Sequence, residues 1–352
     1  MAAAGEEADG AASPLDRRLA PLLLFDRDGI KTADATHQAI DGDATLFFYS
    51  IPSKQLLRRR VAEMEGHRYW TTPQGWLVMA SRTSPVTFLW DPFTGARIDL
   101  PADLDGFLRG DGPKRCLLSS SNPVAADQDC LVLVVDLAKT VLWHCRLGNA
   151  GGDDDGGGRW LKHEYDFAAA GGGATLNGVL GAMRRLTSVG GKFFTSLVNK
   201  VVALDFSPAA GPQFAAIPAD MNKTARRRPP SGGVSTTELV ESQGSLFCVS
   251  FSFSDLHMRF VAGMGVFKLD LAAQAWVRAE SLGGRAFLVH DGFGASLDPQ
   301  EVGLKGDCVY YCMRNDKGLY VHDMERGTTT LRDPSPYLGD HCCTTKFLMP
   351  TC

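Results

Sequence analysis

Two His-Asp pairs are the residues of this chain whose types could do acid–base chemistry. His290 and Asp291 stand in LVHDGFG, and His322 and Asp323 stand in YVHD. A histidine beside a carboxylate can act as a general acid or base when both reach a substrate. Each pair also follows an apolar run, where a short carboxylate accepts hydrogen bonds from turn amides. Two interpretations therefore stay open, a catalytic pair at a channel and an ordinary strand-ending turn.

Aspartates recur at or near the ends of apolar runs along the whole chain. They are Asp91, Asp136, Asp205, Asp270 and Asp323. An active site would break a repeat, whereas a carboxylate that accepts turn amides recurs with the turn. We therefore predict turn chemistry for these aspartates. The glycine-flanked run Asp153–Asp155 is predicted to be a solvated loop rather than a metal site.

Motifs that carry known reactions are missing from the sequence. It contains no Gly-x-Ser-x-Gly turn, no His-Glu-x-x-His motif, no phosphate-cradling Gly loop and no Gly-x-Gly-x-x-Gly run. The nine cysteines include Cys308, Cys312 and the cluster His341–Cys343, but no Cys-x-x-Cys pair. We therefore expect no catalytic residue, no cofactor and no metal, and hence no enzyme. The cysteines are expected to be buried or incidental reduced thiols.

Charge sets further limits on function. The net charge is −4, which argues against a broad surface for nucleic acid or for an anionic membrane. Two basic triplets occur, Arg58–Arg60 in a strand pattern and Arg226, Arg227 and Arg228 in a loop pattern. Such triplets are typical of solvated surface. If the second triplet lies on the same face as the other loops, it is the one we expect to contact a protein partner, and the two prolines that follow it would stiffen the loop.

The elements that must position these residues repeat along the chain. GWLVMASRTSPVTFLWDPFTGARIDLP, which begins at Gly75, reads as three short strands joined by tight turns. Similar units open at Asp129, Gly191, Gly244 and Gly306, and a fainter one spans 44–64. Each unit has a turn residue, an apolar strand, a second strand that tends to end in Asp or His, and a more polar third strand. Further candidate strands stand upstream of the units, at Pro21, Arg115, Arg184, Thr236 and Arg285, which suggests four strands per unit.

Four strands at intervals of about 50 residues are the signature of a β-propeller. We predict an all-β fold of four-stranded antiparallel blades. Six blades fit the copies, with seven as the alternative and a two-sheet sandwich as the rival fold. The only helix candidate is short, around Gly178–Leu186. The recurring tryptophans are predicted to pack between blades, with an aromatic binding rim as the alternative; they are Trp76, Trp90, Trp143, Trp160 and Trp276.

The predicted domain organisation has three parts. Residues 1–18 are expected to be a disordered segment, 19–334 the propeller, and 335–352 an irregular tail or a closing strand. The first residues do not read as a secretory signal, and no apolar run reaches the ~18 residues of a membrane helix. We therefore expect a cytoplasmic or nuclear protein with no membrane contact.

The ordered set of motifs resembles a large plant family. GWLVMASR followed by TFLWDPFTGARIDLP is similar to that family's GWL…NPFTG…I.LP stretch, and DCLVLVV, GGKFFTS, ELVESQGSLFCV and GLYVHDMERGT follow in the family's order. The family is the plant F-box-associated β-propeller group of the KIB type. The resemblance covers Leu19 to Asp333, nearly the whole chain.

The resemblance implies a function in protein recognition. Many members carry an F-box that docks on the Skp-type adaptor of a cullin ubiquitin ligase, and their propeller recognises the substrate, in the best understood cases a protein kinase of steroid-hormone signalling. The residues before Leu19 lack an F-box pattern. We therefore expect a non-catalytic protein-interaction module, either as such a substrate receptor or as a standalone scaffold. The alternative is a propeller enzyme that acts on a small molecule at the central channel.

Overall fold

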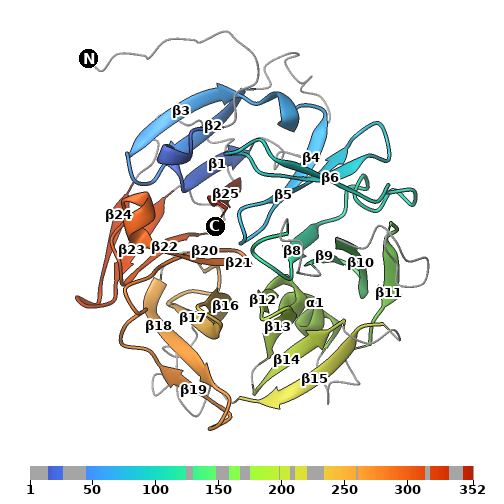
Figure 1. Ribbon diagram of the computed structural model, residues 1–352. Coiled ribbons are helices and arrows are strands. Elements are labelled where there is room, and N and C mark those ends of the chain that lie inside the picture. The colour runs from blue at the N-terminus through green and yellow to red at the C-terminus, as the bar shows by residue number, and fades with distance from the viewer. Residues whose placement is uncertain are drawn as a thin grey trace, which may run out of the picture.

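Six sheets surround a central axis in the computed structural model (Figure 1). The structure describes residues 15–26, 45–123, 130–147, 158–166, 175–197, 199–206, 211–219, 234–258, 261–313, 318–332 and 344–351. Within these ranges the predicted six-bladed propeller is confirmed. Around the central axis, each blade contacts the next through its innermost strands, in the order β25, β4, β8, β12, β16 and β21. The ring is completed by a contact between β20 of the last blade and β25 of the first.

The strand bounds follow the predicted units. Blade 1 contains β1 Leu22–Asp26, β2 Thr45–Ser50, β3 Gln55–Arg60 and β25 Thr344–Leu348. Blade 2 contains β4 His67–Thr71, β5 Leu77–Ser81, β6 Thr87–Trp90 and β7 Arg97–Leu100. Blade 3 contains β8 Lys114–Leu118, β9 Cys130–Asp136, β10 Val141–Leu147 and β11 Leu161–Glu164.

The second half of the ring has the same order. Blade 4 contains β12 Thr187–Val189, β13 Lys192–Leu197, β14 Lys200–Asp205 and β15 Gln213–Pro218. Blade 5 contains β16 Val234–Ser242, β17 Ser245–Phe253, β18 Val261–Asp270 and β19 Ala275–Arg278. Blade 6 contains β20 Ala286–His290, β21 Phe293–Leu297, β22 Cys308–Cys312, β23 Leu319–Asp323 and β24 Thr328–Arg332. The helices are η1 Arg17–Leu19, η2 Ala62–Met64, α1 Leu176–Arg184 and α2 Pro299–Val302.

The ring closes through the last strand of the chain. β25 pairs antiparallel with β1, with Leu348 opposite Leu22. Of the two alternatives expected for 335–352, an irregular tail or a closing strand, Thr344–Leu348 forms the closing strand. Pairing the two ends of the chain in one sheet removes an open edge. The chain already packs onto the propeller before residue 19, because Leu15 is buried and its backbone N–H donates a hydrogen bond to the Pro92 carbonyl oxygen at 2.7 Å.

Blade 6 departs from the four-stranded pattern. β20 and β22 run parallel, and β21 returns antiparallel along β20, so this blade has five strands. β21 packs against β16 of blade 5. Gly294 in β21 lies so close to the Leu239 carbonyl oxygen that a Cβ would collide with it. Gly292, in the turn before β21, has φ +86°, and its Cβ would collide with the Arg184 carbonyl oxygen. The β20–β21 hairpin is thus seated tightly against β16 and the end of α1.

The core lies between the blades, as the apolar inner strands predict. Strands such as β9 are buried along their whole length because blades cover both faces. Four tryptophans are at most 7% exposed; these are Trp76, Trp90, Trp143 and Trp276. Trp160 is half-buried, its ring meets Phe107 edge-on, and its Nε1 donates to the Pro101 carbonyl at 2.8 Å. The packing interpretation of the tryptophans is therefore confirmed.

Turn chemistry explains most of the recurring aspartates. Asp91 Oδ1 accepts from the Phe93 N–H at 2.8 Å, and Asp270 and Asp323 accept turn amides in the same way, each at the end of the strand that precedes the outermost strand of its blade. Asp136 instead ends the second strand of blade 3, and its Oδ1 accepts from the Ala138 N–H at 2.8 Å. The prediction is confirmed for these four. Asp205 pairs with Lys192 at 2.6 Å.

The helix candidate is a true helix, shifted by two residues. α1 spans Leu176–Arg184, and the Thr175 side chain caps it by accepting from the Gly178 N–H. Its last residue reaches the central axis, which places a basic side chain there. No helix in the described part of the chain is long and apolar enough to cross a membrane.

Candidate functional site

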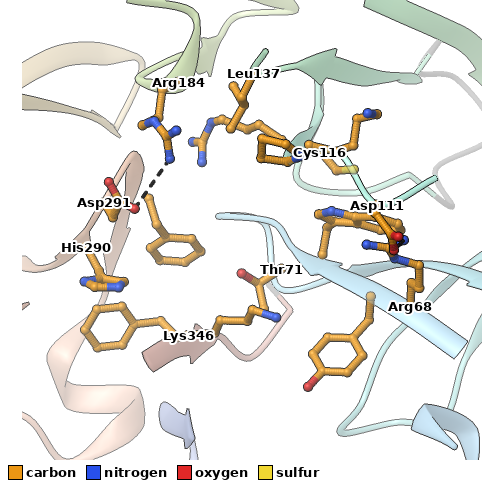
Figure 2. A pocket seen from close by; sticks show the side chains of 17 residues that line it. Arg68, Thr71, Asp111, Cys116, Leu137, Arg184, His290, Asp291 and Lys346 are labelled. Carbon is orange, nitrogen blue, oxygen red and sulfur yellow. Dashed lines mark hydrogen bonds and ion pairs between the residues drawn. The ribbon is translucent and has the colours of Figure 1, made fainter. Parts of the chain in front are cut away.

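A cavity of about 480 Å³ opens at one end of the central axis (Figure 2). Its walls come from β4, from the start of β8 and the loop before it, from the end of α1, from the β20–β21 turn and from β25. Five cationic side chains line it, together with two carboxylates. The cations are Arg68, Lys114, Arg115, Arg184 and Lys346, and the carboxylates are Asp111 and Asp291.

Arg68 and Lys114 are held by partners at the rim. The Arg68 Nη1 donates to the carbonyls of Arg109 and Gly110, at 2.8 and 2.7 Å, and lies 3.3 Å from an Asp111 carboxylate oxygen. The Lys114 ammonium pairs with Asp136 at 3.0 Å, and both side chains are nearly buried. These two side chains are therefore fixed in the cavity wall by their own partners and do not extend into the open space.

Arg115 is the buried cation of the site. It is 9% exposed, and its Nη2 donates to the Leu186 carbonyl at 2.8 Å across the boundary between blades 3 and 4. Its Nε is buried and has no hydrogen-bond partner. Burial lowers the pKa of Arg115 to about 10, which the nearby Glu238 carboxylate partly opposes. The guanidinium is thus charged at neutral pH with one donor unsatisfied.

Glu238 on β16 lies behind the cavity. Its Oε2 accepts from the Gly292 N–H at 2.9 Å, which ties β16 to the β20–β21 turn. Burial raises the pKa of Glu238 to about 7, an effect opposed by the Arg185 and Arg115 charges and reinforced by Asp291. The charge of this carboxyl group is therefore variable near neutral pH.

Arg184 and Asp291 face one another over the open space, joined by a dashed line in Figure 2. Their charged atoms are 3.6 Å apart, and their side chains are 33% and 31% exposed. Next to Asp291, the His290 Nδ1 lies 3.1 Å from the Cys312 carbonyl oxygen. The first His-Asp pair thus does reach the cavity, but the two side chains bond to different groups.

Lys346 and Thr71 occupy the other side of the same view (Figure 2). The Lys346 ammonium lies 4.4 Å from the centre of the Tyr69 ring, a cation–π contact. The second His-Asp pair lies elsewhere. Asp323 pairs with Lys305 on blade 6, and the His322 Nδ1 lies 2.9 Å from the Thr329 hydroxyl.

The predicted partner triplet Arg226, Arg227 and Arg228 falls outside the described residues, as does the cluster His341–Cys343. Cys308 and Cys312 are buried thiols on β22. The described residues contain no group of three or more potential metal ligands.

The sequence interpretation missed the residues that line the cavity most distinctively. These are Arg115, Arg184 and Lys346, and it also missed Glu238, which lies behind the cavity. A signal was present for Arg115, which is the single charge in RCLLSS, whereas TTELVES contains two glutamates, Glu238 and Glu241, and does not single out either. A buried charge in such a strand needs a partner across the axis.

Comparison with known proteins decides the family. A family model described as the KIB1-4 beta-propeller matches residues 48–334. The chain belongs to this family. The match confirms the resemblance read from the motifs, and it ends before the closing strand β25. None of the curated proteins compared with the chain matches it.

Solved propellers of diverse kinds are distantly similar to this KIB1-4 chain. A putative 6-phosphogluconolactonase from Bacteroides fragilis is 12% identical with a TM-score of 0.37, over 93% of this chain and 97% of that one. A streptogramin B lyase is 6% identical with a TM-score of 0.33, over 88% and 84%. The N-terminal domain of Nup159 is 10% identical with a TM-score of 0.28, over 82% and 70%. At these values neither an activity nor a partner is transferred to this chain.

Proposed function

We propose that this KIB1-4 propeller is a non-catalytic protein-interaction module that binds a segment of a partner protein at the cation-lined end of its central axis. The observation that carries the proposal is the convergence of five cationic side chains from β4, β8, α1 and β25 on one open cavity. Loops and strand ends of several blades around one opening suit the binding of an extended segment. An acidic segment would complement the excess of positive charge.

The groups in the cavity support binding over catalysis. The Asp291 carboxylate faces the Arg184 guanidinium, and the His290 Nδ1 lies 3.1 Å from the Cys312 carbonyl oxygen. Cys116 lines the cavity, but burial raises the pKa of its thiol, which keeps it protonated and a poor nucleophile. A nucleophile hydrogen-bonded to a base would be the expected sign of acyl-transfer chemistry.

Within the KIB-type family the partner would be a substrate for ubiquitination, and the module would act in the cytoplasm or the nucleus. A Skp-type adaptor and a cullin are further partners if a ligase link exists. In the alternative version of the proposal, the propeller is a standalone scaffold that binds its partner without a Skp-type adaptor or a cullin. The two versions differ in which proteins accompany the propeller.

Affinity purification from plant cells with a filled cavity tests the proposal. Thr71→Trp places a large ring in the cavity, and Thr328→Trp adds the same ring at an exposed position of the outer strand β24. We expect a reproducible protein partner with the wild type and with Thr328→Trp, and its loss with Thr71→Trp. Thermal unfolding of both variants checks that they fold.

Either of two results would contradict the proposal. A partner retained equally by Thr71→Trp would place binding on another surface. A wild-type protein that captures nothing reproducible would favour the alternative of a small-molecule enzyme. Mass spectrometry of the wild-type sample also shows whether a Skp-type adaptor and a cullin accompany the partner.

A further inference from the structure

The cavity has a surplus of positive charge among the described residues. The five lining cations and Arg185 form one group, and Arg185 acts on Glu238 from the end of α1. Four carboxylates oppose these six positive charges. Asp111 and Asp291 line the cavity, and Asp136 and Glu238 lie next to its cations. Two positive charges are left when Glu238 is ionised and three when it is protonated, in a partly enclosed space where a charge interacts more strongly than in water.

Arg115 adds a donor that the fold leaves unsatisfied. Its side chain is more than nine-tenths buried and belongs to the cavity wall, yet its Nε has no partner. A buried donor without a partner costs about 1–3 kcal/mol, more when the group is charged. The bond from Nη2 to the Leu186 carbonyl fixes the guanidinium in place. The site is thus preorganised for an acceptor.

Two further cations can meet the same acceptor. Arg184 is held to Asp291 only at 3.6 Å and is one-third exposed, so its guanidinium can also serve a ligand. Lys346 stands on the other side of the open space, over the Tyr69 ring (Figure 2). A ligand between these side chains would meet two guanidinium groups and one ammonium.

We propose that this cavity binds a phosphate group carried by a phosphorylated segment of the partner protein, held by Arg115, Arg184 and Lys346. The inference rests on the proposed function and names the chemistry of the ligand. A phosphate ester carries about −1.5 to −2 charges at pH 7 and three acceptor oxygens. This charge balances the positive surplus of the cavity more closely than a single carboxylate does, whether or not Glu238 is ionised. Arginine clusters are a recurrent way to recognise phosphorylated motifs.

Inorganic phosphate is the first probe. The full chain is titrated with phosphate at constant ionic strength by calorimetry, with chloride as the reference salt. We expect saturable binding by the wild type and at least about tenfold weaker binding by Arg184→Gln and by Lys346→Gln. Arg59→Gln on the outer strand β3 is the matched control, because it removes an exposed cation far from the cavity. Its affinity should equal that of the wild type.

Two outcomes of this titration would overturn the inference. One is the absence of saturable binding by the wild type. The other is equal weakening by Arg59→Gln and Arg184→Gln, which would show a general charge effect. Arg184→Gln and Lys346→Gln alter partly exposed side chains and Arg59→Gln an exposed one, and the folding of all three variants is checked by thermal unfolding before titration.

A captured partner separates this inference from the proposed function. The partner is treated with phosphatase and offered again to the wild type and to Thr71→Trp. Loss of binding after phosphatase treatment supports the phosphate site. Binding that survives the treatment but is lost in Thr71→Trp would keep the proposed function and refute the phosphate ligand. Binding that survives both changes would refute the two together.

Discussion

The two ends of the central axis are built by the same strands but have different chemistry. β8 begins at one end with Lys114 and Arg115 and leads at the other into Ser119, Ser120 and Ser121. The second end has its own cavity of about 560 Å³. Hydroxyl groups dominate its wall, supplied by Ser119, Ser120, Ser121, Thr187, Ser188 and Ser296. We call the two the cationic end and the hydroxyl end.

Neutral hydrogen bonds join several polar groups at the hydroxyl end, although the Gln74 Oε1 there is buried without a partner. The Gln74 Nε2 donates to the Ser188 hydroxyl at 2.8 Å, and the hydroxyls of Ser242 and Ser296 are 2.8 Å apart. Neutral groups pack around the axis at little cost in desolvation. The cationic end instead contains ionisable groups whose charged forms are disfavoured by burial, as the pKa shifts of Arg115 and Glu238 indicate. The buried charges of the axis are thus concentrated at the cationic end, where Arg115 and Glu238 lie, and this concentration points to a role in binding.

The largest expected effect comes from breaking the hairpin that lies between the two ends. Gly294→Val places a side chain against the Leu239 backbone and should destabilise the protein by about 3 kcal/mol or more. Gly263→Ala in β18 is the control, because a Cβ there meets nothing within 4 Å. Urea unfolding of both variants measures the difference. Equal stability of the two would contradict the close packing of β21 on β16.

A second prediction compares a buried ion pair at the cationic end with a hydroxyl pair at the other end. Lys114→Met leaves the nearly buried Asp136 without its cation and should cost about 3 kcal/mol. Ser242→Ala removes one neutral bond and should cost about 1 kcal/mol. The free energies of unfolding in urea give both numbers. A larger cost for Ser242→Ala would reverse the comparison.

A third prediction concerns the pH dependence of the cationic end. The pKa of Glu238 is raised from 4.5 to about 7 in the folded protein, so folding favours its protonated form. Its contribution to stability is complete below pH 4.5 and is lost as the pH rises through about 7. Over this window the wild type should lose stability relative to Glu238→Gln, by on the order of 3 kcal/mol.

The control for this pH experiment is Glu241→Gln, on the same strand at the hydroxyl end. Its stability difference from the wild type should not follow that of Glu238→Gln. A pH profile of Glu238→Gln that runs parallel to the wild-type profile would show that Glu238 does not titrate in this range.

The smallest expected effect separates surface charge from charge in the cavity. Arg60 on β3 pairs with Glu65 at the surface, and its side chain is 65% exposed. Arg60→Gln should change the free energy of unfolding by less than about 1 kcal/mol, because water screens exposed pairs. A loss as large as that of Lys114→Met would mean that location at the axis is not what makes a charge important.

The blades could be predicted because each is specified locally. Each unit contains its own turn residues, such as Asp91 and Asp323, and its own apolar runs, such as β9. These features recur from unit to unit, so the period is visible in the sequence. The closing strand β25 is separated from β1 by almost the whole chain, and its pairing is not encoded nearby. The extra strand β21 was missed for a related reason, since its close fit depends on Leu239 of another blade.

The cavity could not be predicted because its residues come from separate units. Arg115, Arg184 and Lys346 lie on blade 3, on α1 and on blade 1, and they meet only when the ring is closed. The sequence did identify His290 and Asp291 as a chemical feature, and the structure places both at this cavity. The interpretation of this pair as a turn was incomplete, because the same turn also forms part of the cavity wall.

Hydrogen–deuterium exchange of the propeller with and without its captured partner tests the central claim most directly. We predict that the partner slows exchange at the cationic end, in residues 68–71, at the start of β8 and in the β20–β21 turn. Residues 119–121 and 187–191 at the hydroxyl end should exchange as in the unbound protein. Protection at the hydroxyl end or on the outer strands, with the cationic end unchanged, would contradict the account.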